Sequence, residues 1–265
     1  MLKLGINTVL FKGFGIKQAL KLIKLAGYDG AELSAIQGMC EHLVLDAWET
    51  QAPLVKAAAR EAGVELLSME VASLDEDRLT KAFKAAKYLG IPVVNVGPGG
   101  KKDDDASFAE QIEVLKARAK LAAEYGVTLC CKAHVGCAVY STPTTLKAME
   151  LIKDESFKID MDPSHIHRAG EKPEDALASV VSRMGHVHIR DCKGDGPSPG
   201  APADQACGRG NINLYGYFKA LVDAGYDGPV CLEVIGPEQT LAAAQAIASE
   251  SYGYMNAILK MLGAR

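Results

Sequence analysis

The order of periodic segments limits the fold of this chain more than any other feature. Short apolar runs alternate with helical patterns along its 265 residues. Strands that alternate with helices predict a parallel sheet with right-handed crossovers. We expect strands at residues 2–8, 28–34, 63–71, 91–97, 126–134, 157–162, 185–191 and 229–236. We expect helices at 16–26, 48–62, 75–89, 107–125, 142–152, 173–183, 214–224 and 238–262.

Eight such units favour a closed barrel. The predicted class is α/β, a single (β/α)8 TIM barrel in one domain over residues 1–265, which fits the usual barrel length of about 250 residues. The alternative is an open doubly wound sheet, but its G-x-G-x-x-G fingerprint after the first strand is missing. The phrase AGYDG recurs at 26–30 and 224–228 and supports a repeated unit.

Charge and cysteine content narrow the partners and the compartment. A net charge of −4 and a pI near 5.9 give no basic patch for nucleic acid. We find no apolar run of about 18 residues for a membrane span, and no signal peptide at the N-terminus. Seven cysteines without a C-x-x-C pair predict reduced thiols in the cytoplasm. The oligomeric state stays open, with a homo-oligomer among the options.

Ionisable residues gather at the expected strand ends, where barrels of this kind keep their chemistry. In HVHIRD, residues 186–191, side chains two apart share a face, so His186, His188 and Arg190 point the same way. An inward Glu233 would be costly to bury unless a cation or another ionised group faced it. The residues at these ends are Glu32, Glu70, Lys132, His134, Asp162, His165, His186, His188, Arg190, Asp191 and Glu233.

Three of these residues suggest a metal site. Carboxylate and imidazole groups from Asp162, His188 and Glu233 suit Mn²⁺, Co²⁺, Fe²⁺, Mg²⁺ or Zn²⁺. The structural alternative is that each one is an ordinary hydrogen-bonding residue. Asp162, before Pro163, could cap a short turn, and His186 is expected to be structural. The case for a site therefore depends on several strand ends together.

At this point the chain resembles a known group of proteins. The segments that carry the resemblance are GYDGAEL (27–33), GVTLCCKAHVG (126–136), DMDPSHI (160–166), GHVHIRD (185–191), GRGNINL (208–214) and YDGPVCLEV (226–234). They resemble the sugar isomerase/epimerase superfamily, the xylose-isomerase-like TIM barrels that include AP-endonuclease-family-2-like proteins. The resemblance covers nearly the whole chain, and it is the order and spacing of the segments that make it specific.

The resemblance implies a divalent metal held by strands five to eight. It assigns Asp162, His188 and Glu233 as ligands, with a glutamate on the fifth strand as the fourth. This chain departs from the pattern there, because Lys132 stands in that position. A protonated lysine cannot ligate a metal. Either a nearby histidine completes the ligand set, or the Lys132 ammonium pairs with Asp162 and Glu233 without a metal.

The implied activity is that of a sugar isomerase or epimerase. Its substrate would be a small polyhydroxylated carbonyl compound, and the reaction would begin with proton abstraction next to the carbonyl. Glu233 or His165 would be the base, and a metal or Lys132 would stabilise the enediolate. The expected substrate-binding residues are Glu32, His134, Arg190 and Lys193.

Other functions stay open. A dehydratase or lyase would share the first step and then expel a leaving group. A Schiff-base lyase through Lys132 is disfavoured, because neighbouring carboxylates would raise the lysine pKa. A non-catalytic sugar-binding barrel is a further alternative. A DNA-repair nuclease is opposed by the acidic pI and the small number of histidines.

Overall fold

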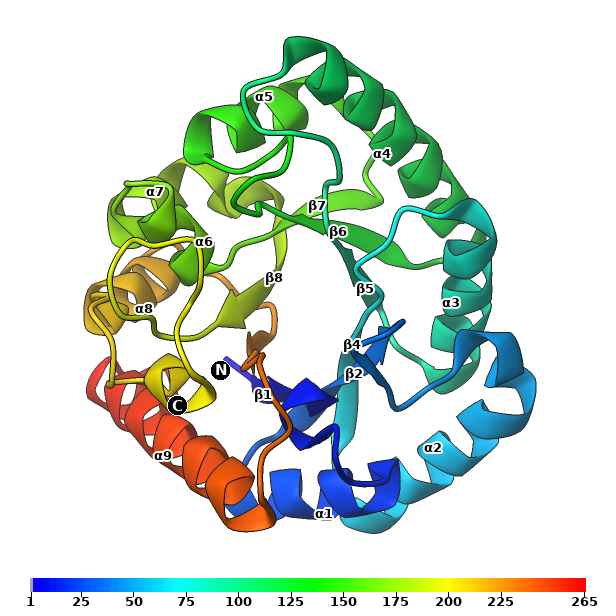
Figure 1. Ribbon diagram of the computed structural model, residues 1–265, viewed down its shortest axis with the longest axis vertical. Coiled ribbons are helices and arrows are strands. Elements are labelled where there is room, and N and C mark those ends of the chain that lie inside the picture. Colours follow the sequence, from blue (N-terminus) through cyan, green and yellow to red (C-terminus); the bar gives the residue numbers. More distant parts are fainter. Residues whose placement is uncertain (1) are drawn as a thin grey trace.

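Eight parallel strands form a closed barrel in the computed structural model, which describes residues 2–265 (Figure 1). Neighbours pair in the order β1-β9-β8-β7-β6-β5-β4-β2, and β1 also pairs with β2. The predicted (β/α)8 TIM barrel of class α/β is therefore confirmed. The strands are β1 Leu4–Asn7, β2 Gly30–Ile36, β4 Glu65–Glu70, β5 Val93–Val96, β6 Thr128–Lys132, β7 Phe157–Asp160, β8 Met184–Ile189 and β9 Val230–Leu232.

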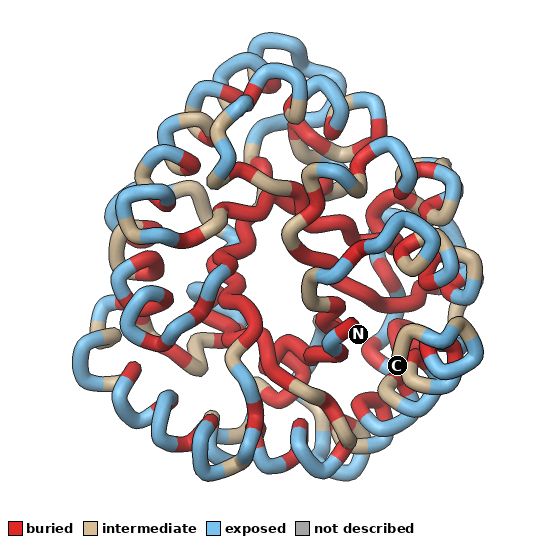
Figure 2. The backbone as a smooth tube through the Cα atoms, turned by 180° about the vertical axis from the view of Figure 1, so that it is seen from behind, coloured by how far each residue is buried: buried red, intermediate tan, exposed pale blue. Residues whose placement is uncertain are grey.

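A ring of helices covers the outside of the barrel. Helix α1 turns Ala19, Leu20 and Ile23 toward the core, as its 3.6-residue period predicts. Buried residues lie on the strands and on the inner sides of the helices, and exposed residues lie along the outer rim (Figure 2). The helices that the sequence predicted are α1 Ile16–Ala26, α2 Trp48–Ala62, α3 Glu76–Leu89, α4 Asp105–Tyr125, α5 Thr142–Leu151, α7 Pro173–Val180, α8 Leu214–Asp223 and α9 Leu241–Met261. Across residues 2–265, every helix is too short or too polar to cross a membrane.

Two further elements were not predicted. Strand β3, Cys40–Glu41, pairs antiparallel with the end of β2, and it is too short to show a periodic pattern. Helix α6, Pro163–Arg168, begins directly after Asp162, whose side chain accepts a hydrogen bond from the Ser164 amide. Four short 3₁₀ turns complete the described chain: Thr8–Phe11, Leu45–Ala47, Val181–Arg183 and Pro202–Gln205.

Glycines on two neighbouring strands leave room for a packed barrel base. A Cβ at Gly5 would lie 2.6 Å from Cys231 Sγ, and one at Gly30 would lie 2.5 Å from Leu67 Cγ. The register between β2 and β4 shifts at Ala31/Glu32, a bulge that directs Leu67 into this space. Below its polar layer the barrel is therefore filled by side chains, and the chemistry is confined to the other end.

Candidate active site

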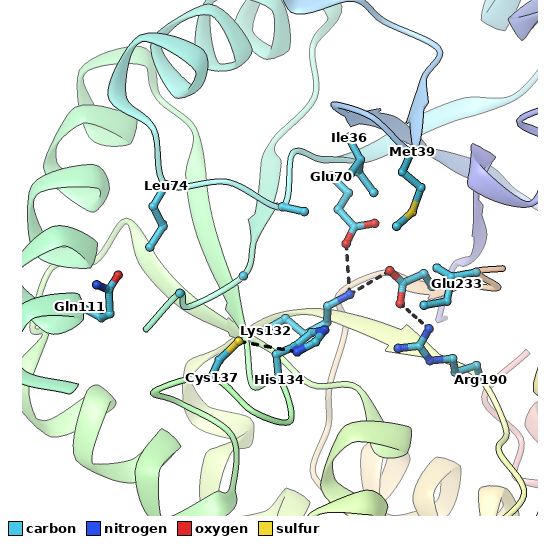
Figure 3. A pocket seen from close by; sticks show the side chains of 14 residues that line it. Ile36, Met39, Glu70, Leu74, Gln111, Lys132, His134, Cys137, Arg190 and Glu233 are labelled. Carbon is cyan, nitrogen blue, oxygen red and sulfur yellow. Dashed lines mark hydrogen bonds and ion pairs between the residues drawn. The ribbon is translucent and has the colours of Figure 1, made fainter. Parts of the chain in front are cut away.

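A lysine lies between two glutamates at the bottom of a pocket in the barrel mouth. Lys132 ends β6, Glu70 ends β4, and Glu233 follows β9 directly, so three strand ends bring these side chains together. Lys132 Nζ donates to Glu70 Oε1 at 3.1 Å and to Glu233 Oε1 at 2.9 Å (Figure 3). All three side chains are at least nine-tenths buried.

An arginine continues this arrangement from the end of β8. Arg190 Nη2 donates to Asp162 Oδ2 at 2.8 Å, and its Nε donates to Ser164 Oγ at 2.8 Å. Its Nη1 lies 3.1 Å from Glu233 Oε2, close enough for an ion pair, although neither atom forms a hydrogen bond. Glu233 therefore lies between two cations. We call Glu70, Lys132, Asp162, Arg190 and Glu233 the pocket floor.

The two glutamates of the pocket floor have opposite pKa shifts. Burial and the negative charge of Glu233 raise the pKa of Glu70 to about 8. Burial would also raise the pKa of Glu233, but Lys132 and Arg190 hold it well below its ordinary value. Glu233 is therefore held ionised, whereas Glu70 keeps a proton to a higher pH than an ordinary glutamate. Such a split is typical of acid–base pairs in enzymes.

Lys132 is an ammonium ion at neutral pH. Burial would lower its pKa, but Glu233 and Glu70 raise it above its ordinary value. A protonated lysine cannot attack a carbonyl carbon, so this environment disfavours the Schiff-base chemistry considered above.

Two histidines line the side of the pocket floor. The rings of His134 and His165 stack with centroids 4.1 Å apart. His165 Nδ1 accepts from the Val135 amide at 3.2 Å, and its Nε2 lies 2.9 Å from Arg190 Nη2. Burial and the charge of Arg190 lower the pKa of His165 well below its ordinary value, so this imidazole is neutral. Its ring lies beside Asp162, and both side chains contact the same guanidinium nitrogen, Arg190 Nη2.

A second group of ionisable residues lies fully buried beneath the pocket floor. His188 Nε2 is 2.5 Å from Glu32 Oε2, and His188 Nδ1 is 2.5 Å from Asp160 Oδ2. His186 Nδ1 is 3.1 Å from Asp160 Oδ1. Burial would raise the pKa of Glu32 and of Asp160, but the two imidazoles lower both. We call Glu32, Asp160, His186 and His188 the inner cluster.

Neutral side chains complete the hydrogen bonds of the inner cluster. Asn95 Nδ2 donates to Glu32 Oε1 at 2.5 Å, and Ser68 Oγ lies 2.9 Å from His186 Nε2. Asn7 Nδ2 contacts Glu32 Oε2 and Glu70 Oε2 at 2.7 Å each. Asn7 therefore links the inner cluster to the pocket floor.

The pocket itself has a volume of about 380 Å³ and unlike sides. Ionisable groups form its bottom, whereas apolar side chains form much of its wall (Figure 3). The apolar residues are Ile36, Met39, Ala72, Leu74 and Ile235. This size admits a small molecule whose polar end reaches the floor.

The residues predicted from the sequence to form the site lie in three places: around the pocket, in the inner cluster and at the surface. Lys132, His134, Arg190 and Glu233 line the pocket. Asp162 and His165 do not line the cavity, but both contact Arg190, which does. Glu32 and His188 lie beneath the floor, in the inner cluster. Lys193 is 60% exposed at the surface, where it pairs with Asp204.

Glu70 is the pocket residue that sequence reasoning left out of the site. It was recognised as a polar strand end, but no expected role was attached to it. The signal was the unexplained Lys132: an inward lysine needs carboxylate partners, and Glu70 ends a strand on the same barrel. A search for those partners would have found it.

Two groups in the described chain hold potential ligand atoms within 4.8 Å of one another. They are Glu70, His188 and Glu233, and Glu32, His186 and His188. The predicted ligand Asp162 belongs to neither group, because it faces Arg190.

These groups are consistent with a divalent ion by residue type, but cations of the chain itself already face the same carboxylates. The Lys132 ammonium already lies between Glu70 and Glu233. Burial would lower the pKa of His188, but Asp160 and Glu32 raise it well above its ordinary value. Both ring nitrogens of His188 already face carboxylates, those of Glu32 and Asp160.

Comparison with known proteins agrees with the barrel fold. A family model described as a xylose isomerase-like TIM barrel matches residues 20–257. An inosose dehydratase of Clostridium botulinum (strain Alaska E43 / Type E3) is 27% identical over 131 residues, which are 45% of this chain and 44% of that protein. The chain thus spans less than half the length of this curated relative.

Solved structures show the same fold at low identity. A D-allulose 3-epimerase from Methylomonas sp. is 16% identical with a TM-score of 0.78, covering 97% of this chain and 98% of its own. The IOLI protein, solved with a bound zinc atom, is 18% identical with a TM-score of 0.80, covering 98% and 99%. Members of this fold therefore include an epimerase and a zinc-binding protein.

Proposed function

Since the chain belongs to the xylose isomerase-like TIM-barrel family, we propose that it is an isomerase or epimerase of sugar metabolism. It moves a proton next to the carbonyl group of a small polyhydroxylated substrate. The observation that carries this proposal is that Lys132 lies between Glu70 and Glu233 in the pocket, where the pKa values of the two carboxyl groups are shifted in opposite directions. Proton transfer needs one base and one acid around a substrate, and this pair supplies both.

The ionised Glu233 takes the proton from the carbon next to the carbonyl. The resulting enediolate carries its negative charge on oxygen, and the Lys132 ammonium stabilises that oxygen in a site shielded from water. The protonated Glu70 then returns a proton. Return to the same carbon from the other face gives an epimer, and return to the neighbouring carbon gives an isomer.

The other pocket residues position the substrate in this scheme. Arg190 and His134 contact oxygens near the reacting carbon, and His165 keeps Arg190 oriented rather than taking the proton. Ile36 and Met39 form an apolar wall on the β2–β3 side of the pocket. Because this wall offers no hydrogen bonds, the carbonyl end of the substrate is directed to the charged floor. Lys193 and the buried Glu32 have no direct contact with the substrate in this proposal.

A dehydratase is the second candidate, and a specific observation favours it. The curated relative named above is an inosose dehydratase, and a protonated Glu70 could equally give its proton to a departing hydroxyl group. The first step, proton abstraction by Glu233, would be unchanged. Only the fate of the enediolate differs between the two candidates.

Exchange in D₂O followed by NMR separates the two candidates. The enzyme is incubated with D-allulose and, separately, with an inosose. Deuterium at the carbon next to the carbonyl with a new epimer or isomer supports the proposal. Loss of a hydroxyl group with formation of an unsaturated product supports the dehydratase. The absence of exchange from every ketose and inosose tried would contradict both.

A further inference from the structure

We infer that Lys132 and Arg190 form a built-in cationic site that binds a substrate oxyanion and replaces a divalent ion. The inference deepens the proposed function, but it also stands on metal affinity, which is measured without any substrate. A solved protein of this fold holds zinc, so the fold itself does not exclude a metal. The side chains of this chain make the difference.

The first argument is the position of positive charge. The Glu70–His188–Glu233 group is the cluster of potential ligands that opens on the pocket. Lys132 Nζ lies within 3.1 Å of both glutamates of that group, with its side chain 7% exposed. A divalent ion at the same carboxylates would face this buried ammonium at short range and with little solvent screening. The two cations exclude each other.

The second argument is that the remaining ligand atoms are already committed. Glu233 Oε2 faces Arg190 Nη1 at 3.1 Å, and Glu70 Oε2 accepts from Asn7 at 2.7 Å. His188 is held between Glu32 and Asp160 through both ring nitrogens. A metal would have to break several of these contacts at once.

The third argument concerns N–H donors of the pocket floor that make no hydrogen bond within the protein. A lysine ammonium has three N–H donors, and Lys132 uses two of them within residues 2–265. Arg190 Nη1 is buried and makes only the ion-pair contact with Glu233 Oε2, without a hydrogen bond. Buried donors are normally satisfied, so these two mark a place for ligand oxygens. The chemical class that fits is an enediolate, a carboxylate or a polarised carbonyl oxygen.

Calorimetric titration with Mn²⁺ tests this inference on the whole protein without substrate. The parent should bind no stoichiometric Mn²⁺. Lys132→Glu removes the ammonium and adds a carboxylate to the same place, so this variant should bind one Mn²⁺ per chain. Lys193→Glu makes the same charge change at an exposed lysine and should leave the affinity unchanged. Tight binding of one Mn²⁺ per parent chain would overturn the inference, as would equal affinity in the two variants.

A second measurement covers the case in which Lys132→Glu fails to fold. Crystals of the parent are soaked in Mn²⁺, and anomalous scattering is recorded at the floor. An absence of signal between Glu70 and Glu233 supports the inference, and a peak there overturns it. EDTA separates this inference from the proposed function. If exchange of substrate protons occurs but stops with EDTA and returns with Mn²⁺, the proposed function stands and the cationic site is wrong.

Discussion

The pocket floor and the inner cluster contain similar residues but have different roles. Both contain two or three carboxylates with basic partners, and both lie at the same end of the barrel. In the inner cluster the partners are imidazoles, all side chains are fully buried, and none lines the pocket. On the floor the partners are Lys132 and Arg190, and the group opens on the cavity.

The difference teaches that residue type alone does not identify a catalytic or metal centre. Carboxylates and imidazoles at strand ends can pair with one another and become part of the core, as His188 does between Glu32 and Asp160. A reactive group needs contact with a cavity and a protonation state that its neighbours have shifted. Floor substitutions should therefore reduce activity most, whereas substitutions in the inner cluster should reduce stability.

The largest effect is expected from Glu233→Gln. This change keeps the shape of the side chain but removes the base, so proton exchange should fall by about 10²–10⁴-fold. The fold should survive. The rate is measured by deuterium incorporation into a confirmed substrate.

Glu238→Gln is the matched control, because Glu238 is exposed on the loop that follows. It should exchange at the parent rate. A Glu233→Gln enzyme that worked as fast as this control would show that Glu233 is only structural.

Asp160→Asn should affect stability instead. It takes the negative charge from two imidazoles that are completely buried, at a cost of about 3–5 kcal/mol in the free energy of unfolding. Urea denaturation measures this loss. Asp223→Asn, at an exposed pair with Lys219, should cost less than about 0.5 kcal/mol. Equal stability of the two variants would contradict the structural role given to the inner cluster.

Lys132→Met should lower both quantities, because Lys132 serves the fold and the chemistry together. Its removal leaves Glu70 and Glu233 facing each other, at a cost of about 3 kcal/mol. Exchange should fall as well, since the enediolate loses its ammonium partner. Thermal unfolding and the exchange rate are compared with Lys193→Met, for which both should stay near the parent values. A Lys132→Met variant as stable and as active as the parent would show that Lys132 supports neither the fold nor the reaction.

The pH dependence should show a smaller effect of Glu70. Its pKa in the folded protein, about 8, is above its ordinary value of 4.5. The folded state therefore binds more protons between these values, and the contribution of this group to stability is lost as pH rises toward 8. Activity should fall in the same direction above about pH 8, because the proton donor is lost. If Glu70→Gln kept this alkaline decline in its residual exchange, another group would be responsible.

The fold could be predicted from sequence more completely than the site. The alternation of strands and helices, together with the helical period, was sufficient to predict the barrel, because both are local sequence patterns. The short β3 and α6 were missed, since neither is long enough to show a period. The resemblance placed Lys132 at the position of a metal ligand and thereby implied that its side chain points inward. Its contact with Glu70 was not predicted, because that contact joins residues 62 positions apart across the barrel.

The depth of each strand-end residue was also beyond sequence reasoning. His188 and Arg190 share a face of β8, and the sequence placed both at the mouth. Two residues of rise separate them, so the imidazole lies in the inner cluster while the guanidinium reaches the floor. Asp162 caps α6, which was one of the roles considered for it, and it also binds Arg190, a contact that the sequence did not predict.

A titration of the Glu70 carboxyl group tests the central claim most directly, because the proposed chemistry needs a proton on Glu70 beside an ionised Glu233. The protein is labelled with ¹³C at the glutamate carboxyl carbons, and Glu70→Gln assigns the resonance. The account predicts a midpoint at about pH 8 for Glu70, with Glu233 ionised throughout the neutral range. A Glu70 midpoint near its ordinary value of 4.5 would contradict the account, because both carboxylates would then be ionised and the floor would hold no acid.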